Sequence, residues 1–132
     1  MDSQSPNTKP YDLEERTYAF ALRIRLFLHN VKWEPVSWPD VKQLLRSSGS
    51  VAANHLESIE AISPTDSLYR LRIVKKEARE SSLWLRLLND CNPLNTENHT
   101  NLQALISESN ELVKIFAPSS EKSPQTSLFP EV

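Results

Sequence analysis

The stretch LNTENHTNLQALISESNELVKIFA, residues 94–117, decides the fold class of this chain. Its apolar and small residues recur at alternating spacings of three and four, one face of an α-helix; they are Leu102, Leu105, Ser109, Leu112 and Phe116. Pro93 and Pro118 enclose the stretch. Because proline is tolerated in the first turn of a helix but breaks its interior, the sequence predicts one helix between them.

The other prolines divide the chain in the same way. Three more proline-free stretches precede this one: Tyr11–Glu34, Asp40–Ser63 and Thr65–Asn92. Helices of about 24 residues are about 36 Å long, and the short connections between them favour antiparallel neighbours. A chain with a single glycine also lacks the turn residues of a sheet. We therefore predict an all-α protein, an antiparallel up-and-down four-helix bundle over residues 11–117.

Apolar stripes and capping residues support this prediction. The second stretch carries one stripe at helical spacing, which comprises Val41, Leu45, Ser48, Ala52, His55, Ile59 and Ile62. The third carries a weaker one, which includes Leu68, Leu71, Ala78 and Leu85. Ser37 with Asp40, and Ser63 with Asp66, resemble capping boxes that would begin the second and third helices.

Composition places the chain in a broad class. Its 132 residues suit one domain, and a net charge of −2 provides no overall attraction to nucleic acid or membrane. The single cysteine, Cys91, excludes an internal disulfide, and no apolar run approaches the roughly 20 residues of a membrane span. We expect a cytoplasmic protein with disordered tails over residues 1–10 and 118–132, which are polar and rich in proline.

The first helix has more apolar surface than one core requires. Its main stripe comprises Leu13, Thr17, Phe20, Ile24, Phe27 and Val31, and a second group covers an adjacent face: Tyr18, Ala19, Leu22 and Leu26. Such a wide apolar arc indicates contact on two sides. The helix either sits deep in its own bundle or contributes to a subunit interface, and we favour the interface because every helix of a four-helix bundle keeps an outer face.

The second helix contains a run of small residues, Ser47–Ala53, with the only glycine, Gly49. Glycine inside a helix costs about 1 kcal/mol relative to alanine. Either the small side chains let a neighbouring helix approach closely, or they leave a shallow binding site with the helix backbone as its floor. Close packing is the usual reason for an interior glycine, and we favour it.

Three ordered groups of residues resemble one bacterial family. They are DLEERT (residues 12–17) with Phe20, LLRSSGSVAAN (residues 44–54) with Glu57 and Ala61, and KEARE (residues 76–80) with Trp84, Leu85 and Leu88. In order and spacing they resemble the four-helix-bundle proteins called 23S rRNA intervening-sequence proteins, which are similar to the accessory proteins of diversity-generating retroelements. The resemblance spans about residues 12–88, and the fourth helix matches in pattern only.

The resemblance implies a homopentameric ring of bundles with a non-enzymatic role. It also implies RNA or DNA as a partner, or a reverse-transcriptase-like protein. Two features depart from the pattern. Ser67 stands where the family tends to have an aromatic residue, and the strongly basic character of the retroelement proteins is absent.

Several charged or polar residues of these motifs would lie beside apolar stripes, where charges need partners. They are Arg16, Arg46, Asn54, Glu57, Glu77 and Glu80. They form either a structural network that fixes helix register or subunit contacts, or a polar ligand pocket. We favour the structural network because ion pairs in such networks are common without any catalytic role.

A basic ridge follows one face of the third helix. Arg72, Lys75, Lys76 and Arg79 recur at helical spacing, with Arg70 nearby. Repeated around a ring, this ridge would become a positive band able to contact phosphates. The alternative is a solvated face that Glu77 and Glu80 neutralise.

The C-terminal segment contains a short motif. The pentapeptide Gln125-Thr-Ser-Leu128-Phe129 resembles the sequence by which bacterial proteins bind the DNA polymerase sliding clamp, although threonine stands where leucine is usual. An apolar pair in a polar tail can enter a pocket on a partner. Short motifs also arise by chance, so a tail without a partner is the alternative.

Catalytic and metal-binding patterns are not found in the sequence. His29, His55 and His99 fall in different segments, no Glu-x-x-His pair occurs, and Cys91 has no nearby histidine. We therefore expect no cofactor, no metal and no enzymatic activity. The sequence favours an oligomeric scaffold that binds a macromolecule, nucleic acid first, with a protein-binding adaptor as the alternative.

Overall fold

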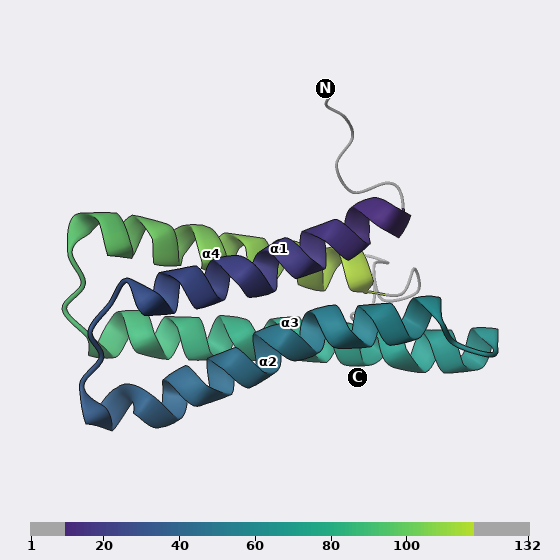
Figure 1. Cartoon of the computed structure of the whole chain (residues 1–132), viewed down its shortest axis with the longest axis horizontal. Helices are drawn as coiled ribbons and strands as arrows, with labels where there is room; N and C mark the ends of the chain where they lie inside the picture. Colours follow the sequence, from purple (N-terminus) through teal and green to yellow (C-terminus); the bar gives the residue numbers. More distant parts are fainter. Residues whose placement is uncertain (1–9, 118–132) are drawn as a thin grey trace, which may run out of the picture.

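The computed structural model describes residues 10–117, which form four α-helices in antiparallel up-and-down order (Figure 1). The helices are α1 (Pro10–His29), α2 (Trp38–Ile59), α3 (Pro64–Cys91) and α4 (Thr96–Phe116), and a short 3-10 helix, η1 (Pro35–Ser37), precedes α2. The predicted all-α four-helix fold is confirmed.

The first helix ends earlier than its proline-free stretch. After His29 the chain turns, and Trp33 packs back on α1 with its ring edge-on to Phe27 at a centroid distance of 5.9 Å. The indole Nε1 of Trp33 donates a hydrogen bond to the carbonyl of Leu28 at 3.2 Å. Pro35 also keeps the helix from continuing through Glu34, because the residue before a proline avoids helical conformation. Glu34 accordingly has an extended backbone.

The serine cap predicted for the third helix is confirmed, and the one predicted for the second helix is wrong. The Ser63 hydroxyl accepts a hydrogen bond from the Asp66 amide at 3.1 Å and caps α3. Ser37 caps nothing with its side chain, because its buried hydroxyl donates instead to Oδ1 of Asn92 at 3.2 Å, at the far end of α3. An unpredicted cap begins α4, where Oδ1 of Asn95 accepts from the Asn98 amide at 2.8 Å.

The core follows the predicted stripes along most of the bundle. Its fully buried members include Phe20, Ile24, Leu44, Val51, Val74, Leu85, Leu88, Leu102 and Leu112. The pair α2 and α3 shares the largest contact, and α1 with α4 shares the smallest of the four between neighbouring helices. Between α2 and α3 the hydroxyls of Ser47 and Ser81 lie 2.8 Å apart, both fully buried, so the small-residue run does allow close packing.

The predicted stripes are wrong where the second helix ends and the third begins. Ile59 is 47% exposed, Ile62 is 96% exposed and Leu68 is 39% exposed. The cause is visible in Figure 1, where the α2–α3 hairpin extends beyond the start of α1 and the end of α4. No other helix remains to cover these side chains there. Within residues 10–117 no helix is long and apolar enough to cross a membrane.

Candidate functional site

The basic ridge lies on the outer face of α3. The helix turns Val74, Ala78 and Leu85 into the core, where each is fully buried. Positions opposite this stripe must therefore point outward. Arg72, Lys76 and Arg79 are exposed there, and Lys75 is partly buried at the edge of the face.

Arg70 does not belong to this ridge. Its Nη1 donates to Oδ1 of Asn54 on α2 at 3.2 Å, and its guanidinium carbon lies 5.8 Å from the ring centroid of Tyr69. The Asn54 amide in turn donates to the carbonyl and hydroxyl of Ser50, at 3.0 and 2.8 Å. Arg70 and Asn54 therefore tie the outer part of the α2–α3 hairpin together.

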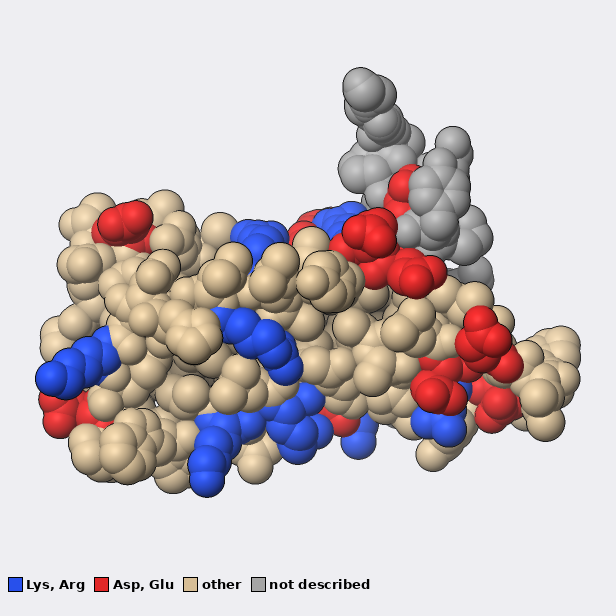
Figure 2. All heavy atoms as spheres, viewed as in Figure 1, with Lys and Arg blue, Asp and Glu red and all other residues tan. Residues whose placement is uncertain are grey.

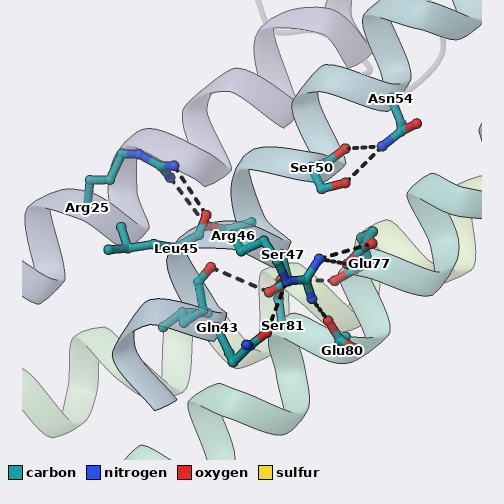
Figure 3. Close-up of polar contacts among 12 residues, drawn as sticks. Arg25, Gln43, Leu45, Arg46, Ser47, Ser50, Asn54, Glu77, Glu80 and Ser81 are labelled. Atoms are coloured by element: carbon teal, nitrogen blue, oxygen red, sulfur yellow. Dashed lines mark hydrogen bonds and ion pairs between the residues drawn. The ribbon is translucent and has the colours of Figure 1, made fainter. Parts of the chain in front are cut away.

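Arg46 of α2 binds both acidic residues that the sequence placed beside the ridge (Figure 3). Its Nη1 lies 3.2 and 3.3 Å from the two carboxylate oxygens of Glu77, and its Nη2 binds Glu80. Its Nε donates to Gln43 at 3.0 Å. Glu77 is only 6% exposed, so its charge depends on this partner.

The two carboxylates are therefore turned away from the ridge and toward α2. Within residues 10–117, Arg72, Lys76 and Arg79 form no salt bridge with either of them. The ridge also continues beyond the residues that the sequence analysis named. Arg86 is exposed seven residues after Arg79 on the same face, at a spacing that is also present in the sequence.

Arg16 has a partner that the sequence did not indicate. Its Nε and Nη2 donate to the Glu108 carboxylate on α4 at 2.7 and 2.9 Å, which is a two-point ion pair between α1 and α4. The hydrogen bond to Glu108 raises the pKa of Arg16 above its ordinary value. Glu57 lies exposed on α2, and no hydrogen bond or ion pair joins it to another residue of the described range. Five of the six polar residues thus fall into three separate contacts, of which only Arg46 with Glu77 and Glu80 joins several of them, and Glu57 takes part in none.

A further polar contact joins α1 to α2 beside the only glycine (Figure 3). Arg25 donates to the Leu45 carbonyl and the Ser48 hydroxyl of α2, each at 3.2 Å, and to the Ala21 carbonyl of its own helix at 3.0 Å. Arg25 could not be predicted from the sequence as a contact residue, because a lone arginine on an apolar helix gives no spacing signal.

The outer face of α1 remains apolar in the single chain. Tyr18 is 59% exposed, Leu22 40% and Leu26 54%. Figure 2 shows this side of the molecule, with Lys and Arg over the middle of the α1–α2 face and Asp and Glu gathered where α1 begins and α2 ends. The face therefore combines exposed apolar side chains with a separation of charge along its length.

The histidines and the cysteine lie in separate surroundings. Among the described residues no three His, Cys, Asp or Glu side chains lie together as a metal site. His55 is buried edge-on against Phe116 at 5.4 Å, its Nδ1 has no hydrogen-bond partner, and burial lowers its pKa. His99 bonds Asn89 at 3.0 Å, and Cys91 is exposed. The predicted partner-binding residues of the tail, Gln125, Leu128 and Phe129, lie outside the described residues.

The comparison with protein families gives the decisive result. Residues 12–115 match the model of the 23S rRNA-intervening sequence protein family. The chain belongs to this family. A solved structure of a protein of unknown function from the S23 ribosomal protein family of Bacteroides thetaiotaomicron VPI-5482 is similar to it, with 28% sequence identity and a TM-score of 0.67. The match covers 83% of this chain and 95% of the Bacteroides chain.

The match thus extends over all four helices, including α4, for which the sequence predicted only a general pattern. No curated protein matches the chain significantly. The comparisons assign the family and leave its biochemical role to be inferred from the surface.

Proposed function

We propose that this protein is a non-enzymatic homo-oligomeric scaffold, a pentamer, that binds nucleic acid through the outer face of α3. The contact between Arg46 and the two carboxylates of Glu77 and Glu80 carries the proposal. It removes from the ridge the acidic side chains that would otherwise neutralise Arg72, Lys76 and Arg79. Exposed cations that lack neighbouring carboxylates are what phosphate binding requires.

The length and composition of the ridge indicate how it would bind nucleic acid. From Arg72 to Arg86 it extends about 21 Å along the helix, enough to follow several phosphates of one strand. Contacts of Lys and Arg with phosphates position a nucleic acid but carry no base information. We therefore expect weak binding by one subunit, little sequence preference and a steep dependence on salt.

Oligomerisation would multiply this weak binding. The exposed apolar residues of α1, Tyr18, Leu22 and Leu26, support a subunit interface. The charge separation along the α1–α2 face favours one orientation of the neighbouring subunit (Figure 2). A ring would place five copies of the ridge on one assembly, and linked sites bind more tightly than separate ones.

Nucleic-acid binding is tested by filter binding of RNA and DNA at low salt. The triple variant Arg72→Glu, Lys76→Glu and Arg79→Glu should reduce binding at least tenfold. A matched control, Lys32→Glu, Lys42→Glu and Lys114→Glu, changes net charge equally at exposed positions elsewhere and should reduce it far less. Absent binding by the unaltered protein, or equal losses in both variants, would overturn the proposal.

The oligomer is tested by light scattering after gel filtration. The unaltered protein should have five times the mass of one chain, 15.1 kDa. Leu22→Glu with Leu26→Glu should release smaller species, whereas Ile62→Glu, at an exposed apolar residue of the hairpin turn, should not. A monomer, or equal behaviour of the two variants, would contradict the interface on α1.

A protein-binding adaptor is the alternative function, and the motif Gln125-Thr-Ser-Leu128-Phe129 favours it. Purified sliding clamp should then retain the full chain and lose it after Leu128→Ala with Phe129→Ala. A pull-down from bacterial lysate with and without nuclease separates the two functions. Partners lost after nuclease favour nucleic-acid binding, and partners that survive favour the adaptor.

A further inference from the structure

A pocket lies between the second half of α1 and the first half of α4. Arg23, Leu26 and Phe27 line it from α1, Asn30 from the turn that follows, and Asn101 and Leu105 from α4. Its volume is about 200 Å³. A dry cavity of roughly 150 Å³ holds a benzene ring, so this pocket has room for one aromatic side chain.

The lining combines an apolar floor with a polar rim. Phe27 and Leu105 are buried at 3% and 2% exposure and form the floor, while Leu26 is half exposed at the side. At the rim, Asn30 and Asn101 are exposed and can each donate and accept hydrogen bonds. Arg23 is the only charged residue among those that line the pocket in the described range.

We propose that the segment 118–132 of the same chain folds back along the α1–α4 face and places the ring of Phe129 in this pocket. The sequence of this segment, PSSEKSPQTSLFPEV, is otherwise polar, and Leu128 and Phe129 are its only adjacent apolar residues. A covalent tether holds such a segment near the pocket at an effective concentration in the millimolar range. A weak pocket can therefore be occupied by it.

The length of the segment fits this path. From Phe116 back to Leu105 the distance along α4 is about 16 Å, since a helix rises 1.5 Å per residue. From Ala117 to Phe129 an extended chain reaches about 40 Å. The segment can therefore turn at the end of α4 and return to the pocket without strain.

Charge and hydrogen bonding fit as well. In an extended segment, side chains two positions apart lie on one side, about 7 Å from each other. With the Phe129 ring in the pocket, Glu131 would lie at the rim, where Arg23 supplies the opposite charge. The amides of Asn30 and Asn101 would satisfy backbone groups of the docked segment, which need partners when water is displaced.

This docking has a consequence that does not depend on the proposed nucleic-acid function. A partner that binds Leu128 and Phe129 would compete with the pocket for the same ring. The pocket would therefore hold the motif in a closed state until a tighter partner captures it.

A nitroxide label tests the proposal in the full chain. In a Cys91→Ser background, a label on Ser127→Cys should broaden the methyl NMR signals of Leu26 and Leu105 more than that of Val113, near the end of α4. In the same chain with Phe129→Ala, the broadening of Leu26 and Leu105 should fall at least twofold, while Leu128→Ala should keep most of it. Strongest broadening at Val113 in the unaltered chain, or no effect of Phe129→Ala, would overturn the proposal.

Two further experiments test the position of Glu131 and whether the segment docks on its own chain. Arg23→Glu should reduce the broadening at Leu105, and adding Glu131→Arg should restore it. Failure of the restoration would contradict the placement of Glu131 at the rim. Oligomers assembled from urea, with the label and the observed methyl groups on different chains, should show no broadening at Leu105. Broadening there would mean that the segment docks on a neighbouring subunit and would overturn docking within one chain.

Discussion

The guanidinium of Arg25 in α1 occupies the space that a side chain at Gly49 in α2 would fill. A Cβ built on Gly49 would lie 2.9 Å from Nη2 of Arg25, closer than such atoms approach. The same guanidinium donates to the Leu45 carbonyl and the Ser48 hydroxyl of α2. A side chain at position 49 would require the end of the Arg25 side chain to shift, so glycine here leaves the guanidinium its place against Leu45 and Ser48.

Gly49→Ala should lower the free energy of unfolding by about 1 kcal/mol, because displaced charged hydrogen bonds, worth about 2 kcal/mol, outweigh the helix propensity of alanine, about 1 kcal/mol. In an Arg25→Ala background, the same substitution should instead stabilise by about 1 kcal/mol. Urea unfolding at one protein concentration measures both. Equal effects in the two backgrounds would show that Arg25 and Gly49 are not coupled.

Because Arg46 pairs with the nearly buried Glu77, a single Arg46 variant should lose more stability than a double variant that also removes the Glu77 charge. Arg46→Met should lower the free energy of unfolding by about 2 kcal/mol, because it leaves the nearly buried carboxylate of Glu77 without its partner. Adding Glu77→Met should recover at least half of this loss. Adding Glu80→Met should recover less, since Glu80 is 36% exposed and can be solvated by water. Thermal unfolding of the four proteins decides between these outcomes.

His55 predicts a loss of stability in mild acid. Burial lowers its pKa below the unfolded value of 6.5, although Glu14 opposes the shift. The unfolded chain therefore binds a proton before the folded chain does, so stability is full above about pH 6.5 and declines as the pH falls below it. His55→Phe keeps a ring against Phe116 and removes the titration. Between about pH 7.5 and 5.5, the free energy of unfolding of the His55→Phe variant should fall less than that of the unaltered protein. Equal pH dependence of the two proteins would contradict this.

Much of the fold could be predicted from the sequence because prolines and apolar spacing act locally. The stripe of α4 is confirmed in full, with Leu102, Leu105, Ser109, Leu112 and Phe116 all buried. Periodicity assigns a face to each helix, but it does not tell where the covering helix ends. For this reason Ile59 and Ile62 were expected in the core, although they lie on the exposed end of the hairpin.

The contacts between helices were harder to predict. Glu108 lies 92 residues from its partner Arg16, and only the axial register of α4 against α1 brings the two together. Ser37 illustrates the same limit, since its hydroxyl bonds to Asn92 of a distant connection rather than to its own helix. The outward face of α3 could be predicted, because exposure opposite a buried stripe follows from the sequence of that helix alone.

The unequal contacts between helices have a kinetic consequence. The α2–α3 pair combines the largest contact with the short connection of residues 60–63, whereas α1 and α4 meet through a smaller contact across most of the chain. Contacts between segments close in sequence form first, because closing a short loop costs less entropy. Disrupting Ser47 and Ser81 should therefore slow refolding, whereas breaking Arg16 from Glu108 should mainly accelerate unfolding. In stopped-flow experiments, the bundle should thus assemble from its central hairpin outward.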